Sequence, residues 1–197
     1  MDTIVYEIEG SLYINLTNKC SNNCDFCIRN HRDGMEDYNL WLSKNPTADE
    51  IIAELKNQNF QNYKSVVFCG YGEPLYALDT MLEVAKFVKE YGIATRVNTN
   101  GQADLICGEG VAKRFAGLID VVNISLNESD RDKYQKVCHC AFGEKGYDAL
   151  LKFASEVKDY SNVIFSIVDT IPQEDIEKCK KIAEDIGVTL RIREYIK

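Results

Sequence analysis

The sequence Ser11-Leu-Tyr-Ile-Asn-Leu-Thr17, followed after two residues by Cys20-Ser-Asn-Asn-Cys24-Asp-Phe-Cys27, joins a largely apolar stretch to three closely spaced thiols. The apolar stretch predicts a strand, and the cysteines follow where that strand ends. A loop this short cannot span a sheet, so its thiolates converge on one small volume, which suits a metal better than a set of disulfides. An iron-sulfur cube normally takes four thiolates. Three local thiolates would therefore leave one iron open.

The same loop allows two other interpretations. Cys27-Ile-Arg-Asn-His31 could complete a site of three cysteines and one histidine, and closed tetrahedral zinc with such ligands is common. The cysteines could also be unligated thiols. The loop alone leaves the iron-sulfur cluster, the zinc site and free thiols open as alternatives.

Composition and charge narrow the class of protein. The chain has 197 residues, 45% of them apolar, which fits one domain, residues 1–197, with a single core. A net charge of −8 argues against a nucleic acid as main partner, because phosphate binding depends on Lys and Arg. The first residues carry acid where a secretory signal carries base, and no apolar run approaches the ~20 residues of a membrane span. We therefore expect a cytoplasmic protein with no membrane partner, whose eight cysteines are metal ligands or buried thiols.

Short apolar runs alternate with helical patterns along the whole chain, which is typical of parallel strands joined by crossover helices. Six strands are predicted, over residues 11–17, 65–70, 94–99, 121–126, 163–168 and 189–195. Six β/α units are too few for the closed eight-stranded barrel. We therefore predict an α/β fold, a (β/α)6 partial TIM barrel in a single domain.

Helices are predicted between these strands. Thr47 and Glu50 form the pattern of a capping box at the start of the first helix. The others are predicted from Asp79 or Thr80 to Gly92, over 110–116, over 147–160, and from after Pro172 to Gly187.

Parallel α/β sheets bind ligands at the carboxyl ends of their strands. Residues suited to binding follow the predicted strands two to five: Cys69-Gly-Tyr-Gly-Glu-Pro74, Asn98-Thr-Asn-Gly101, Ser125-Leu-Asn127 and Ile167-Val-Asp-Thr170. Taken singly, these segments also fit ordinary turns. In the last strand, Arg191 and Arg193 share one side, where they either meet a substrate anion or are solvated.

The order and position of these segments resemble those of the radical S-adenosylmethionine (SAM) enzyme family across essentially the whole chain. The resemblance implies that Cys20, Cys24 and Cys27 bind a [4Fe-4S] cluster whose open iron is occupied by SAM. The residues that the resemblance implies for SAM binding are Phe26, Gly70, Gly72, Glu73, Pro74, Asn98, Thr99, Asn100, Ser125, Asn127 and Val168. Among them, the glycines and the carboxylate of the Gly-Tyr-Gly-Glu-Pro segment would hold the SAM amino group.

Within this family the chain is most similar to the small radical SAM proteins associated with TatD-type nucleases. The resemblance implies an enzyme that is reduced by a flavodoxin or ferredoxin and cleaves SAM to methionine and a 5′-deoxyadenosyl radical, which abstracts hydrogen from a substrate. The chain ends at Lys197, soon after the last strand, which predicts a wide barrel mouth open to a macromolecular substrate. Two alternatives stay open: an activase that installs a radical on a protein partner, and a non-catalytic zinc-binding module.

The remaining cysteines carry weaker signals. Cys138-His139-Cys140 resembles a second metal site, but one residue between two thiolates is poor geometry for a chelate. Cys69, Cys107 and Cys179 are interpreted as buried or incidental thiols. No catalytic side chain is assigned from the sequence.

Overall fold

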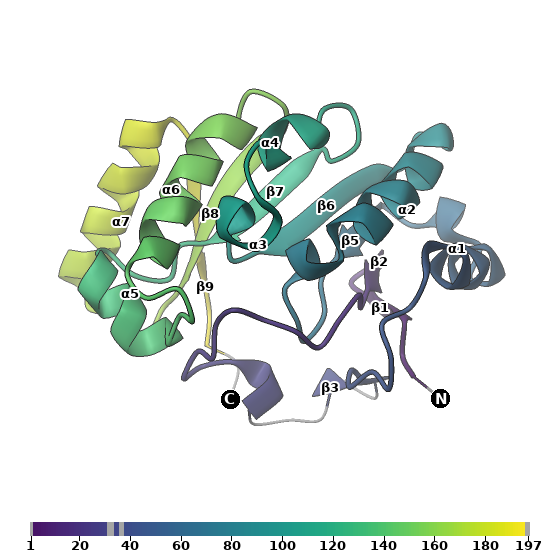
Figure 1. Ribbon diagram of the computed structural model, residues 1–197, viewed down its shortest axis with the longest axis horizontal. Coiled ribbons are helices and arrows are strands. Elements are labelled where there is room, and N and C mark those ends of the chain that lie inside the picture. The colour runs from purple at the N-terminus through teal and green to yellow at the C-terminus, as the bar shows by residue number, and fades with distance from the viewer. Residues whose placement is uncertain (1, 31–33, 36–37, 196–197) are drawn as a thin grey trace.

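Six parallel strands follow one another around a curved sheet in the same order in space as in the sequence (Figure 1). They are β2 (Ser11–Ile14), β5 (Ser65–Phe68), β6 (Ala94–Thr99), β7 (Val121–Ser125), β8 (Asn162–Val168) and β9 (Thr189–Arg193). This arrangement comes from a computed structural model that describes residues 2–30, 34–35 and 38–195. The predicted (β/α)6 partial barrel is confirmed, and each predicted strand is present.

One strand of the sheet was not predicted. β1 (Val5–Ile8) pairs antiparallel with β2 through the turn at Glu9 and Gly10, both of which have positive φ. Two short strands, β3 (Gly34–Met35) and β4 (Tyr38–Asn39), form a separate pair.

The helices cover the outer side of the curved sheet, as Figure 1 shows. They are α1 (Ala48–Asn57), α2 (Leu78–Glu90), α3 (Ala103–Cys107), α4 (Val111–Arg114), α5 (Arg131–Cys138), α6 (Lys145–Val157) and α7 (Gln173–Ile186). Single 3-10 turns occur at η1 (Ile28–Asn30), η2 (Phe60–Asn62) and η3 (Pro74–Ala77). No helix in the described part of the chain is both long and apolar enough to cross a bilayer.

The ends of several helices follow from local chemistry. Thr47 and Glu50 form the predicted capping box of α1, and α7 ends at Gly187 in the left-handed conformation. The helix predicted over 110–116 is present as the shorter α4, whereas α3 was not predicted, and Gly108 and Gly110, both with positive φ, separate the two helices.

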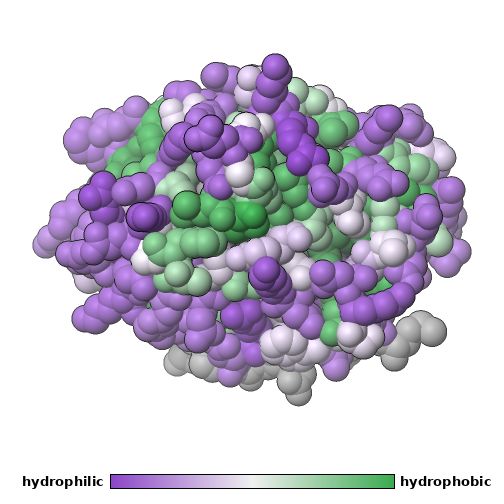
Figure 2. All heavy atoms as spheres, in the orientation of Figure 1, coloured by the Kyte–Doolittle hydropathy of each residue, from purple (hydrophilic) through white to green (hydrophobic). Residues whose placement is uncertain are grey.

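The strands alternate between two sides of the sheet. Side chains such as Leu12, Val66 and Val97 are buried against the helices in the main core. The residues between them, such as Tyr13 and Arg96, lie on the opposite, inner side of the sheet. Figure 2 shows hydrophobic residues in a band across the middle of the viewed face, surrounded by hydrophilic ones. The sheet therefore has an apolar outer layer and a largely polar inner side.

Candidate functional site

The cysteine loop, residues 15–27, lies at the carboxyl end of β2. Cys27 donates its backbone N–H to the carbonyl of Cys24 at 3.0 Å, so the loop closes in a tight turn before η1. Arg29 braces it by donating from Nη2 to the carbonyl of Asn22 at 3.0 Å. Cys20, Cys24 and Cys27 are all partly exposed. The three cysteines thus share one short, partly exposed loop, and the convergence of their thiolates on one metal stays a prediction.

The surroundings of the three thiols raise the pKa of each. Burial raises the pKa of Cys20 to about 12 and also raises the pKa of Cys27. The pKa of Cys24 is raised by a hydrogen bond with the Cys138 thiol and by burial. Among the described residues, no three His, Cys, Asp or Glu side chains are already grouped as a metal site. His31, the fourth ligand of the zinc alternative, lies outside the described residues.

The donor set nevertheless fits a cluster with three thiolate ligands. A bound metal ion lowers the pKa of its thiol ligands and displaces their protons. The raised pKa values of these cysteines are therefore compatible with metal binding. Cys24 would have to turn from Cys138 toward the other two loop thiols.

The loop after β5 packs tightly onto the cysteine loop. A Cβ on Gly70 would lie 2.1 Å from Oδ1 of Asn15, and one on Gly72 would lie 2.2 Å from the carbonyl oxygen of Thr17. Glu73 donates its backbone N–H to the carbonyl of Lys19 at 2.8 Å. Gly72 is therefore needed so that the two backbones can meet, and Gly70 leaves room for the side chain of Asn15.

The carboxylate of Glu73 ties this loop to the end of β6. It accepts hydrogen bonds from the hydroxyl of Thr99 at 2.6 Å, from the N–H of Asn100 at 2.7 Å and from the N–H of Leu75 at 3.1 Å. Pro74 is buried at the first position of η3. Glu73 is only 3% exposed, and burial raises the pKa of its carboxyl to about 7. Three donors thus already occupy this carboxylate.

The raised pKa of Glu73 gives stability a specific pH dependence. The folded protein retains the Glu73 proton up to about pH 7, whereas the unfolded chain releases it near 4.5, so Glu73's contribution to the free energy of unfolding falls as pH rises between these values. In Glu73→Gln we expect the decrease in the free energy of unfolding over this pH range to be smaller by up to about 3 kcal/mol. Urea unfolding of both proteins between pH 4 and 8 measures it, and parallel curves would contradict the assignment.

A buried network of polar side chains connects the cysteine loop to β6 and α5. Ser21 Oγ donates to Gln102 Oε1 at 2.6 Å and accepts from Asn100 Nδ2 at 2.8 Å. Gln102 Nε2 donates to Asn22 Oδ1 at 2.9 Å and to the hydroxyl of Tyr134 at 3.0 Å. Asn22 Nδ2 donates to the same hydroxyl at 2.8 Å. Sequence reasoning missed four of these five residues, all except Asn100. The signal that could have found Ser21 and Asn22 is that three consecutive polar residues separate Cys20 from Cys24.

Removing one hydroxyl should show how much this network contributes. Tyr134→Phe leaves the amides of Asn22 and Gln102 without their buried acceptor, so we expect a loss of about 1–3 kcal/mol in the free energy of unfolding. Tyr160→Phe is the matched control, because Tyr160 is 41% exposed and should change stability by less than about 0.5 kcal/mol. Equal effects in the two variants would show that the network is not stabilising.

α5 docks directly on the cysteine loop, which the sequence did not predict. The N–H groups of Asn23 and Asp25 donate to the carbonyls of Cys138 at 2.9 Å and Val137 at 3.0 Å. The ring of His139 contacts the carboxylate of Asp25 at 2.7 Å. The Cys138-His139-Cys140 segment is therefore part of the wall around the loop, with both cysteines buried.

The other predicted SAM-binding residues are spread along the sheet. Asn98 hydrogen-bonds the Cys69 thiol on the inner side, and Asn127 donates from Nδ2 to Cys138 Sγ at 3.5 Å. Phe26 packs against the main core. Ser125 and Val168 end β7 and β8, and no described hydrogen bond joins their side chains to the cysteine loop. The structure thus brings together the residues after β2, β5 and β6, with Asn127 nearby through Cys138.

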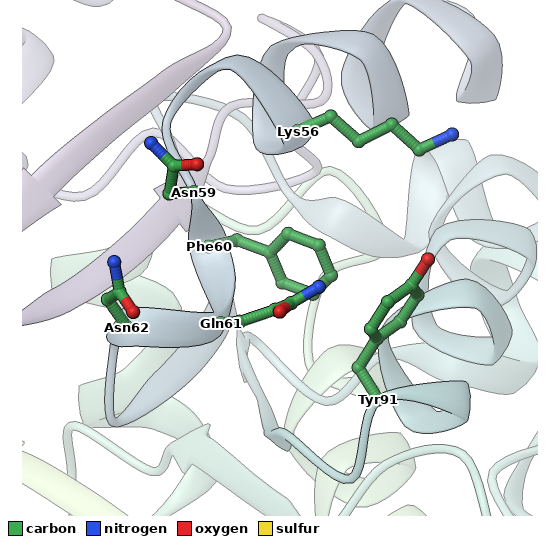
Figure 3. A pocket seen from close by; sticks show the side chains of 6 residues that line it. All are labelled: Lys56, Asn59, Phe60, Gln61, Asn62 and Tyr91. Atoms are coloured by element: carbon green, nitrogen blue, oxygen red, sulfur yellow. The ribbon is translucent and has the colours of Figure 1, made fainter.

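Two hollows in the surface lie elsewhere. One, of about 180 Å³, is lined by Lys56, Asn59, Phe60, Gln61, Asn62 and Tyr91, whose rings and amides Figure 3 shows around it. The other is lined by residues at the amino ends of β8 and β9. Neither includes a cysteine, and both lie at the end of the sheet opposite to the one that binds ligands in this fold class.

The chain is similar to known proteins over most of its length. Residues 14–186 match the model of the radical SAM superfamily. A probable GTP 3′,8-cyclase from Thermococcus kodakarensis is 29% identical over 188 residues, covering 93% of this chain and 56% of that protein. A putative glycyl-radical enzyme activating enzyme from Methanocaldococcus jannaschii is 27% identical over 195 residues, covering 94% and 73%. The chain therefore spans little more than half of the cyclase.

The fold has solved counterparts as well. Streptococcus suis SuiB, solved with its precursor peptide SuiA, superposes with a TM-score of 0.74 at 19% identity, covering 98% of this chain and 40% of that one. At this identity the likeness concerns the fold alone. The family model covers most of the chain, and the chain belongs to the radical SAM superfamily, whose members use a [4Fe-4S] cluster and SAM. The similarity to the TatD-associated subgroup stays a prediction.

Proposed function

We propose that residues 1–197 act as a radical SAM core in which Cys20, Cys24 and Cys27 hold a [4Fe-4S] cluster. The observation that carries this proposal is the position of the three thiols on one accessible loop at the carboxyl end of β2, tied by buried hydrogen bonds to the loops after β5 and β6. When bound, the cluster and SAM supply the reductive cleavage that yields methionine and a 5′-deoxyadenosyl radical able to abstract hydrogen from a substrate.

The chain's own residues give the cluster a defined place. Gly72 lets the loop after β5 lie against the cysteine loop, and Glu73 fixes that loop to β6. Gln102 and Tyr134 hydrogen-bond Ser21 and Asn22, which lie between the first two cysteines. The residues Gly70, Gly72, Glu73, Asn98, Thr99, Asn100, Ser125, Asn127 and Val168 would then surround SAM, with Phe26 and Pro74 packing behind. The expected reductant is a flavodoxin or ferredoxin, and the expected compartment is the cytoplasm.

A second candidate differs only in substrate. The relative named as a putative glycyl-radical enzyme activating enzyme supports an activase whose substrate is a protein. The relative named as a probable GTP 3′,8-cyclase supports a small-molecule substrate instead. The zinc-binding module has lost its main support, because the family match covers the cysteine loop and most of the sheet.

One experiment tests the shared chemistry. The protein is reconstituted anaerobically with iron and sulfide, reduced in the presence of SAM and assayed for 5′-deoxyadenosine. We expect product from the native protein together with absorbance near 400 nm, which zinc thiolates lack. A protein that purifies with stoichiometric zinc and forms no deoxyadenosine would refute the proposal.

A further inference from the structure

The charged residues of the six parallel strands are all positive, although the chain as a whole is negative. The protein has a net charge of −8, yet β2 and β5 to β9 contain three arginines and not one Asp or Glu. The arginines are Arg96 on β6 and Arg191 and Arg193 on β9. A sheet that excludes acid while retaining three cations is arranged to receive negative charge.

Strand register places these arginines on the inner side. On β6, Thr95, Val97 and Thr99 are buried toward the helices, so Arg96 and Asn98 point inward. On β9, Leu190 packs against the main core, so Arg191 and Arg193 face the other way. Their lateral partners agree, because Arg193 pairs with Val168 and Arg191 with Ser166, both on the opposite side of β8 from the core residues Phe165 and Ile167.

Arg96 and Arg193 still have unused hydrogen-bonding groups. Arg96 donates from Nη2 to the hydroxyl of Tyr13 at 2.9 Å, and its guanidinium carbon lies 5.8 Å from the centre of that ring. The Nε atoms of both Arg96 and Arg193 are buried and without a hydrogen-bond partner in the described structure. Neither side chain belongs to any of the ion pairs formed among the described residues, such as Lys133 with Asp175. Buried donors without partners are rare, so these two point to a missing acceptor.

The two guanidinium groups lie on the same inner side of the sheet. Their charges both act on the thiol of Cys69, at the end of β5, although they come from β6 and from β9. Arg193 also lies within electrostatic reach of Cys24. Asn98 reaches the same Cys69 thiol, and Asn123 and Ser166 hydrogen-bond each other at 3.2 Å farther along the inner side. The cations thus lie within a polar surface close to the proposed cluster.

We propose that Arg96 and Arg193 bind an oxyanion of the substrate, a phosphoryl or carboxylate group, on the inner side of the half-barrel. A guanidinium group matches both anions with two parallel N–H donors. The substrate is therefore anionic, and its charged group sits next to the cysteine loop. This inference rests on the proposed function, because the anion belongs to a substrate only if the chain is a radical SAM enzyme. The anion site itself does not depend on SAM cleavage.

The test is calorimetric titration with inorganic phosphate and, separately, with acetate at constant ionic strength. Two samples of the full chain are titrated. One is the reconstituted protein with saturating SAM under anaerobic conditions, and the other is the protein as purified. We expect Arg96→Gln and Arg193→Gln each to weaken anion binding by about 10-fold or more, because each removes a charge-assisted hydrogen bond of about 1.5–3 kcal/mol. Arg114→Gln, which removes the same charge from a residue paired with Asp79 on the outside, should change it less than about 2-fold.

Circular dichroism and the thermal midpoint confirm that each variant is folded. Preference for phosphate identifies a phosphorylated substrate, and preference for acetate a carboxylate substrate; either supports the proposal. If native protein binds neither anion, or if Arg114→Gln weakens binding equally, the proposal is wrong. It is also wrong if the arginine variants lose SAM affinity and not phosphate affinity, since the arginines would then serve the SAM carboxylate. Phosphate binding through Arg96 and Arg193 in a chain that never cleaves SAM would refute the proposed function and leave the anion site standing.

Discussion

Cys24→Ala is expected to purify without an iron-sulfur cluster, whereas Cys138→Ala should retain it, although the two thiols contact each other in the structure. The reason is their attachment. Cys24 shares a short, partly exposed loop with Cys20 and Cys27, while Cys138 is fully buried at the end of α5. A cluster of this kind is held by three loop thiolates instead of the usual four, and its fourth iron stays open. The cysteines that hold it must therefore be accessible.

Iron analysis and absorbance near 400 nm measure this effect. Native and Cys138→Ala proteins should each carry about four iron atoms after reconstitution, and the Cys24→Ala protein should fall to background, with no deoxyadenosine formed. Cys179→Ala, a buried cysteine on α7, controls for loss of a thiol as such. Equal loss of iron in the Cys24 and Cys138 variants would overturn the assignment and make Cys138 a ligand.

Gly72→Ala is expected to disturb the cysteine loop nearly as severely. The added methyl group would lie 2.2 Å from the carbonyl oxygen of Thr17 and 2.7 Å from that of Lys19, and these backbone atoms cannot rotate away. Overpacking of this kind costs about 1–3 kcal/mol, and relief requires the loop to move just before Cys20. We therefore expect both a lower free energy of unfolding and poor iron loading.

The control separates these two readouts. Gly92 has a φ of +70° and open space around it, so Gly92→Ala should lower stability through backbone strain of about 1–2 kcal/mol without affecting iron loading. Urea unfolding and iron content are measured for both variants. Normal iron loading in Gly72→Ala would show that the contact between the two loops does not position the cysteines.

The sequence was sufficient for the strands because each one is a short apolar run between recognisable helix ends. β1 was missed because the acid in Val-Tyr-Glu-Ile interrupts the apolar run that would mark a buried strand. α5 was missed because only Tyr134 and Cys138 are buried along its eight residues, too few for a helical period to show.

The parts of the site formed by residues close together in the sequence could be predicted. The parts formed by residues far apart in the sequence could not. The spacing of Cys20, Cys24 and Cys27 is visible in eight residues of sequence. The bond from Ser21 to Gln102 joins positions 81 residues apart, so no local pattern contains it. The same holds for the contact of Cys24 with Cys138, which depends on how α5 docks on the loop.

The long-range anchoring of the cysteine loop also sets an order of events during synthesis. Asn22 leaves the ribosome early, but its partner Tyr134 follows 112 residues later. At about 5–20 residues per second, this is a delay of roughly 6–22 s. During that interval the three cysteines are exposed on a nascent chain in which Tyr134 is still missing from the network. Iron delivered before α5 has formed would meet loose thiols, and iron delivered afterwards would meet a shaped loop.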